Sequence, residues 1–439
     1  MSSFQVTGGT PLHGSVRIGG AKNASFKLMI ASLLGEGESR LLNFSRISDV
    51  ELVASIIQYL GAKVNRAGER ALFVIPTGLS SATINPEHGE QGRFSTMFIP
   101  VLLHRFGEAH VPAPGGDKIG ARPLERHFDG LKAMGATIGI ENGMYVARAP
   151  KGLIGTTYRF SKNSHTGTET LIMAAAKAVG KTVLENAAEE PEIDDLIAFM
   201  VAMGAHIRRR AHRVIEIEGV PRMDGAIHRL IPDRNEAVSY ACAAIATKGD
   251  VIIENAKHEH LTYFLDKLEE IGAGYEVGTY GIRFFYKQPL QSTDITTAIE
   301  PGFMTDWQPL FATLLTQCAG VSTLHETIYP DRFQYVDELI NMGAQIDRFN
   351  PEVSDPQKTY NFELSSDKPS YFHAIKITGP TPLKAGTFTV KDLRHGASLI
   401  MAAMMASGTS TIQQVEHVDR GYESLDERLR SMGAQIVRI

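Results

Sequence analysis

The sequence lacks the features that mark several large classes of protein. Of its 439 residues only Cys242 and Cys318 are cysteines, and neither stands in a CxxC or metal-type spacing. This argues against a disulfide framework or a cysteine-based metal centre, and we expect two buried free thiols in a protein of the reducing cytoplasm. The start, MSSFQVTGGTPLHGSV, has no signal-peptide pattern, and no apolar run is long enough to span a membrane.

A large excess of charge of one sign is also missing. The formal net charge is -5, with 44 basic and 49 acidic residues, which argues against a general nucleic-acid or membrane-surface binder. The chain contains no GxxxxGK[ST], GxGxxG, GxSxG or HExxH motif. The sequence therefore lacks the motifs typical of nucleotide hydrolysis, dinucleotide redox chemistry, serine hydrolysis and zinc proteolysis. We also expect no metal.

A short phrase recurs six times along the chain. It reads YLGAKV, AMGATI, AMGAHI, EIGAGY, NMGAQI and SMGAQI, and its glycines are 74, 69, 68, 71 and 90 residues apart. Each phrase follows an amphipathic run such as DVELVASIIQYLGA, so the glycine suits a left-handed helix cap before a strand. Most units also contain an earlier run that is apolar on nearly every face, such as TETLIMAAAKAVGK, which predicts a buried helix.

Each unit therefore reads as a strand, a buried helix, a strand, an exposed helix and two strands. The length favours two domains, so we expect an α/β protein with three units in each domain. Helices that are apolar on every face need enclosure, which predicts that three of them pack inside a ring of sheets in each domain.

Charged residues interrupt the apolar pattern where the buried helices begin. They occur in GGAKN, GRFST, KNSHTGTE, PDRNEA, MTDWQP and KDLRHGAS. If the helices of each domain point the same way, their amino ends share one rim, where free N–H groups and helix dipoles favour anions. Two facing rims would form a cleft for a polyanionic substrate, lined by Lys22, Arg93, Lys162, Arg234 and Arg394. A solvated surface position is the alternative for each cation taken alone.

Two acids stand out among these cations. Asp117 lies in the glycine-rich loop VPAPGGDKIGARPLERH at 111–127, and Asp306 lies in MTDWQP. Each can be an ordinary turn or helix-cap residue. Beside clustered arginine and lysine, each can instead accept or donate a proton.

Several of these motifs, in their order along the chain, resemble the enolpyruvyltransferase family, whose fold is EPSP synthase-like. The resemblance runs from GGTPLHGSVRIGGAKNASF to HVDRGYESLDERLRSMGAQI and includes IGARP, ENAAEEPEI, IPDR, TDWQP, YPDRFQYVDEL and DRGYE. It implies two inside-out α/β barrel domains of three βαβαββ repeats, one at 22–231 and the other at 1–21 and 232–439, with the active site in the cleft between them. It also implies that 111–127 is a mobile lid that closes over the substrates.

The resemblance implies a reaction as well. The enolpyruvyl group of phosphoenolpyruvate is transferred to the 3-hydroxyl of UDP-N-acetylglucosamine, and phosphate is released. This is the first committed step of peptidoglycan precursor synthesis, and in this family it requires no metal or organic cofactor. The implied partners are these two small molecules, without nucleic acid or membrane, and the sequence leaves the oligomeric state open.

Roles for individual residues follow from the same resemblance. Phosphoenolpyruvate is expected to be held by Lys22, Arg122 and Arg394, with Arg93 facing the same anions and Asn23 orienting the sugar. Asp306 is the expected general base or proton relay, Asp117 the proton donor of the lid, and Arg332 helps order the closed state. The uridine and diphosphate are expected to lie along Arg122, Pro123, Leu124, Glu125, His127, Lys162, Ser164, Ile328 and Tyr329.

Position 117 departs from the family pattern, because the family usually has cysteine where this chain has Asp117. A carboxyl group can take the general-acid role, so we expect an active enzyme that fosfomycin does not alkylate.

The segments 162–170 and 233–240 also depart from the pattern, and Glu125 replaces the usual Asp. Two alternatives therefore stay open: transfer to another uridine nucleotide such as UMP, as in nucleoside antibiotic synthesis, and a non-catalytic paralogue that binds nucleotide sugar. The shikimate-pathway branch is disfavoured because its Gly-Asn-Ala-Gly-Thr signature is absent.

Overall fold

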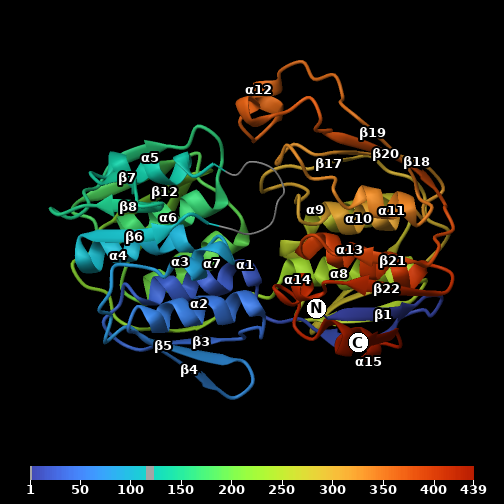
Figure 1. Cartoon of the computed structure of the whole chain (residues 1–439), viewed down its shortest axis with the longest axis horizontal. Coiled ribbons are helices and arrows are strands. Elements are labelled where there is room, and N and C mark those ends of the chain that lie inside the picture. Colours follow the sequence, from blue (N-terminus) through green and yellow to red (C-terminus); the bar gives the residue numbers. More distant parts are fainter. Residues whose placement is uncertain (1, 115–122) are drawn as a thin grey trace. The chain divides into compact units, whose positions relative to one another are not determined.

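The computed structural model describes residues 2–114 and 123–439, which form two compact domains. Domain 1 begins at Gly20 and ends at Ile231. Domain 2 combines the amino-terminal segment through Gly19 with Pro232–Ile439. Each domain is a mixture of helices and short sheets (Figure 1).

Domain 1 follows the predicted order of elements except in its second repeat, which begins with α3 instead of a strand. Its first repeat holds α1 (Lys22–Ser32), β3 (Ser39–Leu42), α2 (Ser48–Tyr59), β4 (Lys63–Ala67) and β5 (Ala71–Ile75). The second holds α3 (Pro86–Glu90), a 3-10 turn (Ser95–Phe98), α4 (Ile99–Phe106), β6 (Glu108–Pro112), α5 (Glu125–Ala133), β7 (Thr137–Glu141) and β8 (Met144–Arg148). The third holds β9 (Thr157–Arg159), α6 (His165–Ala175), β10 (Lys181–Glu185), α7 (Pro191–Ala202), β11 (His206–Ala211) and β12 (Val214–Glu218), and β13 (Ile227–Arg229) follows it.

Domain 2 repeats the same order, starting from β1 (Ser3–Thr7) and β2 (His13–Arg17). Its first repeat continues with α8 (Arg234–Ala246), β14 (Asp250–Glu254), a 3-10 turn (His258–His260), α9 (Thr262–Glu270), β15 (Gly274–Gly278) and β16 (Gly281–Phe285). Next come β17 (Ile295–Thr296), α10 (Gln308–Leu315), β18 (Gly320–His325), α11 (Val336–Asn341), β19 (Gln345–Phe349), α12 (Pro356–Thr359), a 3-10 turn (Leu364–Ser366) and β20 (Ala374–Gly379). The last repeat holds β21 (Thr387–Thr389), α13 (Leu393–Met405), β22 (Thr409–Gln413), α14 (Glu416–Asp419), α15 (Leu425–Ser431) and β23 (Gln435–Arg438).

The first and fourth repeats exchange their first strands. Strand β2 pairs in parallel with β14 inside domain 2, with Ser15 opposite Ile252. Strand β13 pairs in parallel with β3 inside domain 1, with His228 opposite Leu41. The chain therefore passes between the domains twice, at Gly19–Gly20 and at Ile231–Pro232. The last repeat is completed by the chain's own start, because β1 pairs with both β22 and β23.

The recurring glycine caps the exposed helix in a left-handed conformation, as the sequence predicts. At all six positions its φ angle is positive, between 80° at Gly272 and 103° at Gly204 and Gly343. A residue with a Cβ is strained at such angles, whereas glycine adopts them freely and lets the chain turn from the exposed helix into the next strand.

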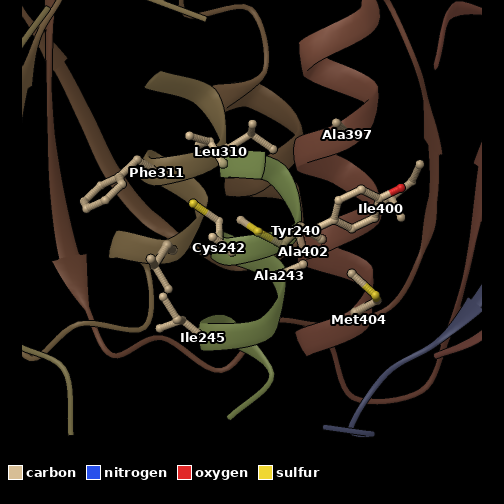
Figure 2. Packing of buried hydrophobic residues seen from close by; sticks show 14 of the residues in the cluster. Tyr240, Cys242, Ala243, Ile245, Leu310, Phe311, Ala397, Ile400, Ala402 and Met404 are labelled. Atoms are coloured by element: carbon tan, nitrogen blue, oxygen red, sulfur yellow. The ribbon is translucent and has the colours of Figure 1, made fainter. Parts of the chain in front are cut away.

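The helices that are apolar on every face are the centres of two separate hydrophobic cores, one in each domain. In domain 2 the inner helices α8, α10 and α13 contact one another. Figure 2 shows side chains of all three meeting there, including Cys242, Leu310 and Ile400. Cys242 and Cys318 are both buried and unbridged, as expected. Since burying one large aliphatic side chain contributes about 1.5–3 kcal/mol, these helices are stable only when enclosed.

Among the residues that the structure describes, no helix combines the length and the apolar character that crossing a lipid bilayer requires.

Candidate active site

In domain 1, side-chain contacts tie the starts of the inner helices together. Phe26 of α1 packs against Phe94, which precedes the 3-10 turn leading to α4, with ring centres 4.9 Å apart. Lys27 of α1 forms an ion pair with Glu169 of α6 at 2.7 Å. The amino-terminal halves of α1 and α6 and the entry to α4 therefore lie at one end of the domain, the arrangement that favours an anion there.

Lys22 and Asn23 open α1 at this end. The Lys22 ammonium lies 3.1 Å from a carboxylate oxygen of Asp49 in the first turn of α2, and its side chain is 12% exposed. Asp49 thus fixes the direction of the ammonium group, while enough of its surface stays open to contact a ligand.

The starts of α5 and α6 are also joined. Nε2 of His127 lies 2.9 Å from Oγ1 of Thr166, and Arg126 donates a hydrogen bond of 3.0 Å to the Asn163 carbonyl oxygen. Burial, and to a smaller extent the charge of Arg93, lowers the pKa of His127 from 6.5 to about 4. His127 is therefore neutral near pH 7 and acts by hydrogen bonding. Six residues predicted to bind the acceptor lie in these two helix starts: Pro123, Leu124, Glu125, His127, Lys162 and Ser164.

Ser164 caps α6. Its hydroxyl oxygen accepts a hydrogen bond of 3.1 Å from the Gly167 N–H group, so the hydroxyl proton remains available to donate elsewhere. Lys162, two residues earlier, is partly exposed. A capped helix start beside a lysine is suited to a phosphate group.

Two of the predicted residues, Asp117 and Arg122, lie outside the described residues. Their roles as the lid's proton donor and as a ligand of phosphoenolpyruvate therefore stay predictions.

In domain 2 the main feature is a group of three residues, Asp306, Arg332 and Arg394, which we term the Asp306 cluster. Nη2 of Arg332 lies 3.3 Å from Oδ1 of Asp306, and Nη2 of Arg394 lies 3.3 Å from its Oδ2. The side chains of Arg332 and Arg394 are 4% and 5% exposed, whereas that of Asp306 is 25% exposed. One partly open carboxylate is therefore held between two buried guanidinium groups.

Further contacts fix the position of Arg394. Its Nη1 donates a hydrogen bond of 2.9 Å to the Tyr422 hydroxyl, which lies 2.7 Å from the hydroxyl of Ser239 on α8. Asp392 caps α13 and accepts hydrogen bonds from the backbone N–H groups of Arg394 and His395. Hydrogen bonds thus hold Arg394 both at its backbone N–H and at its guanidinium group.

The Asp306 cluster carries an excess of positive charge. Burial opposes the charge of Arg394, but Tyr422 and Asp306 raise its pKa well above the usual range. Burial likewise opposes the charge of Arg332, whose pKa is raised by Asp392 and Asp306. The Nε atoms of both arginines are buried without a hydrogen-bond partner among the described residues. The three residues of the cluster contain two positive charges and one negative charge, and Asp392, Glu326 and Asp233 act on the arginines from outside it. Guanidinium groups suit phosphate and carboxylate as ligands.

Ile328, a predicted acceptor contact, lies in a loop held by a buried acid. Oε1 of Glu326 accepts hydrogen bonds of 2.8 Å from the N–H of Ile328 and 3.1 Å from that of Tyr329. Its Oε2 accepts a hydrogen bond of 2.9 Å from Thr305, next to Asp306. The Glu326 side chain therefore connects the loop of Ile328 to the loop of Asp306.

Arg234 differs from the expectation that it lines a cleft. It is buried, forms an ion pair of 2.7 Å with Glu300 and lies 5.8 Å from the centre of the Trp307 ring. Its charge is thus neutralised inside domain 2, because the helix start that it occupies is enclosed.

Sequence reasoning missed Tyr422, Ser239 and Glu326. Tyr422 lies in DRGYE, one of the motifs on which the resemblance rests, but it was given no role. A buried tyrosine hydroxyl requires a hydrogen-bond partner, so its motif could have pointed to a neighbouring charged group.

The described ranges, 2–114 and 123–439, contain no group of three or more histidine, cysteine, aspartate or glutamate residues arranged to hold a metal ion.

Known proteins resemble this chain over its whole length. The family described as EPSP synthase (3-phosphoshikimate 1-carboxyvinyltransferase) matches residues 6–429. The chain belongs to this family. The UDP-N-acetylglucosamine 1-carboxyvinyltransferase of Protochlamydia amoebophila is 40% identical over 443 residues, which cover 99% of this chain and 94% of that protein. The protein of the same name from Halothermothrix orenii is 37% identical over 439 residues, 100% of both chains.

Solved structures of the family have the same fold. The enolpyruvyl transferase NikO from Streptomyces tendae superimposes with a TM-score of 0.86 at 22% identity, covering 100% of this chain and 98% of that chain. An EPSP synthase from Acinetobacter baumannii gives a TM-score of 0.73 at 18% identity, with 100% of both chains covered. These similarities confirm the predicted family fold.

Proposed function

We propose that this protein transfers the enolpyruvyl group of phosphoenolpyruvate to the 3-hydroxyl of UDP-N-acetylglucosamine and releases phosphate, the first committed step of peptidoglycan precursor synthesis. The observation that carries the proposal is the Asp306 cluster, a carboxylate held between two buried arginines in a chain that matches the family over residues 6–429. Relatives that are 37–40% identical over nearly their whole length carry the name of this activity.

The Asp306 cluster supports two parts of the reaction. Arg394, with its locked guanidinium group, binds the phosphate or carboxylate of phosphoenolpyruvate and balances the charge of the leaving phosphate. Asp306 is partly exposed beside the two guanidinium groups, and a carboxylate in this position can accept a proton. Asp306 removes the proton from the attacking hydroxyl, and Arg332 keeps its carboxylate in place.

Domain 1 supplies the remaining contacts in this proposal. Lys22 and Arg93 act with Arg122 on the anionic groups of phosphoenolpyruvate, and Asn23 orients the sugar. The acceptor's uridine lies along Pro123, Leu124, Glu125 and His127, and its diphosphate lies near Lys162 and Ser164. The capped, partly exposed start of α6 supports the diphosphate assignment.

A second proton is required at the methylene carbon of phosphoenolpyruvate, because the hydroxyl adds to the neighbouring carbon. We assign it to Asp117, at the position that carries the family's usual cysteine. A protonated carboxyl group donates as a thiol does. The methyl group formed in this way then loses one proton as the phosphate leaves, which restores the double bond of the enol ether. The segment 111–127 acts as a lid that excludes water during these steps.

The partners in this proposal are two small molecules, and no cofactor takes part. The buried cysteines are unbridged, which accords with a reducing compartment, and we propose the cytoplasm.

Phosphate release from phosphoenolpyruvate by the purified protein tests the proposal. The acceptors compared are UDP-N-acetylglucosamine, UMP and none, with Asp306→Ala and Asp117→Ala as variants. Release with UDP-N-acetylglucosamine alone, lost in both variants, supports the proposed activity. Release with UMP alone identifies a transferase for another uridine nucleotide, and release with neither acceptor indicates a paralogue that only binds nucleotide sugar.

A further inference from the structure

One connection in domain 2 differs from its counterparts in the other repeats. The last two strands of a repeat are joined by short turns at 68–70, 142–143, 212–213 and 279–280. Between β19 and β20 the chain instead runs through 350–373, which we term the β19–β20 insertion. It contains α12, drawn in orange in Figure 1, and accounts for the longest spacing between the repeat glycines.

The β19–β20 insertion leaves the sheet pairing intact. Phe349 at the end of β19 lies opposite Ala374 at the start of β20, in an unbroken antiparallel register. The backbone N–H of His373 donates a hydrogen bond of 2.8 Å to Oδ1 of Asn350, which closes the neck of the insertion. The insertion therefore leaves and re-enters the sheet at the same point, and the pairing of β19 with β20 does not depend on it.

A small aromatic cluster fixes the insertion to β18. The rings of Tyr360 and Phe362 stack with centres 4.9 Å apart, and the His373 ring lies 5.0 Å from the former and 5.2 Å from the latter. The Tyr360 hydroxyl lies 3.3 Å from Nε2 of His325, the last residue of β18. Tyr360, Phe362 and His373 are each about 5% exposed, so this cluster is a small core of its own.

The same cluster holds the loop of Ile328. The Asn361 N–H donates a hydrogen bond of 2.8 Å to the Thr327 carbonyl oxygen, and the Glu326 N–H donates one of 2.7 Å to the His373 carbonyl oxygen. Glu326 in turn binds the N–H group of Ile328. The main chain before Ile328 is therefore paired with the insertion at Glu326 and Thr327. Thr327 is also held by Thr297, whose Oγ1 accepts a hydrogen bond of 2.8 Å from the Thr327 N–H and whose carbonyl oxygen accepts one of 2.5 Å from the Thr327 hydroxyl.

We propose that the β19–β20 insertion is a specificity element for the nucleotide end of the acceptor, acting by fixing the course of residues 326–329. This inference rests on the proposed function, in which Ile328 contacts the acceptor. Tyr360 and Phe362 are positioning residues that touch neither substrate. Without them the hydrogen bond between Asn361 and Thr327 loses its support. Ile328 and Tyr329 are then less closely fixed, although Glu326 and Thr297 still hold this segment.

The effect is specific to the acceptor. Phosphoenolpyruvate binds through Arg394, whose contacts to Tyr422, Asp306 and Asp392 come from elements outside the insertion. Loosening residues 326–329 should therefore weaken binding of UDP-N-acetylglucosamine and leave binding of phosphoenolpyruvate unchanged. A merely structural role would instead lower the amount of folded enzyme, and with it kcat, without changing either KM.

The test measures kcat and both KM values for Tyr360→Ala and Phe362→Ala. The matched control is Lys358→Ala in α12, whose side chain is 87% exposed and forms an ion pair with Asp355, three residues earlier in the same insertion. A further variant replaces residues 350–373 by Asn-Gly, which suits a two-residue hairpin between Phe349 and Ala374. Acceptor binding is also followed by the fluorescence of Trp307, the only tryptophan in the sequence.

We expect both alanine variants to raise the KM and Kd for UDP-N-acetylglucosamine about tenfold, with the KM for phosphoenolpyruvate changed less than about twofold. Lys358→Ala should match the wild type, and the Asn-Gly variant should show the same acceptor effect as the alanine variants or a larger one. Unchanged acceptor KM and Kd in folded alanine variants, or equal effects on both substrates, would overturn the inference. A wild-type protein without activity on UDP-N-acetylglucosamine refutes the proposed function itself, and this inference with it.

Discussion

Arg394 donates a hydrogen bond of 3.3 Å to Asp306, across 88 residues of sequence. The two residues come from different repeats of domain 2, at the starts of α13 and α10. The pairing follows from the fold: the inner helices contact one another, so their starts, where the charged residues lie, are brought together.

Asp306→Asn removes the proposed proton acceptor but keeps the shape of the side chain. We expect kcat to fall by a factor of about 10²–10⁴, the range typical for loss of a general base. The KM for phosphoenolpyruvate should change little, because Arg332 and Arg394 stay in place. Steady-state phosphate release measures both values. Asp347→Asn, at an exposed position of β19, is the control, and a kcat near wild type for Asp306→Asn would show that the carboxylate is not the base.

Tyr422→Phe removes the hydroxyl that accepts a hydrogen bond from Arg394 and lies 2.7 Å from the Ser239 hydroxyl. Losing one hydrogen bond to a charged group costs about 1.5–3 kcal/mol, so we expect a clear loss of stability in urea unfolding. The guanidinium group also becomes less fixed, and the KM for phosphoenolpyruvate should rise several-fold while that for the acceptor stays constant. If the acceptor KM rises instead, Arg394 serves the nucleotide sugar.

Fosfomycin should not inactivate the protein. The position of the reactive cysteine holds Asp117, and the two cysteines present are buried, which raises the pKa of Cys318 to about 12 and that of Cys242 further. Neither supplies the thiolate that the epoxide would alkylate. Intact-mass measurement after incubation should show no adduct, and Asp117→Cys should gain one. An adduct on the wild-type chain contradicts the prediction.

His127 should make the folded state less stable in acid. Burial and Arg93 lower its pKa from the usual 6.5 to about 4, so between these values the unfolded chain binds a proton that the folded chain does not. Stability is therefore lost as the pH falls from 6.5 towards 4, by up to about 3 kcal/mol for this group. Urea unfolding should show a shallower pH dependence for His127→Gln. His206→Gln, at an exposed position, should keep the wild-type slope, and equal slopes for all three proteins would refute the assignment.

Lys27 and Glu169 form a buried ion pair in domain 1, with side chains 2% and 0% exposed. Lys27→Met leaves the carboxylate with only the partly exposed His165, 3.1 Å away, and should cost about 3–5 kcal/mol. Replacing both residues, as Lys27→Met with Glu169→Leu, should recover most of this loss, because no buried charge is left unpaired. Urea unfolding of the two single variants and the double variant measures the coupling. Additive losses would mean that the pair contributes nothing beyond its separate residues.

The repeated architecture could be predicted from the sequence because its signals are local. A run that is apolar on every face identifies an inner helix, and the glycine after each amphipathic run identifies a turn. Non-local features gave no such signal. The exchange of β2 and β13 depends on strand pairing across 237 residues for β2 and 187 residues for β13. Lys27, in an otherwise apolar run, gave no sign of its buried partner on α6.

The candidate site could be predicted in part for the same reason. Lys22, Asp306 and Arg394 stand at helix starts, where a charged residue contrasts with the apolar run that follows. Tyr422 and Glu326 act through contacts with residues far away in the chain, so only the fold brings out their roles. The β19–β20 insertion was visible in the sequence only as a longer spacing between two glycines.

The most direct test of the account identifies the product. Purified protein is incubated with phosphoenolpyruvate and UDP-N-acetylglucosamine, and the nucleotide sugar is analysed by mass spectrometry and by NMR of the sugar ring. The account predicts one new nucleotide sugar that carries an enolpyruvyl ether on the 3-oxygen, formed in equal amount with free phosphate and absent with Asp306→Asn. Phosphate release without this product, or no change in the nucleotide sugar, would contradict it.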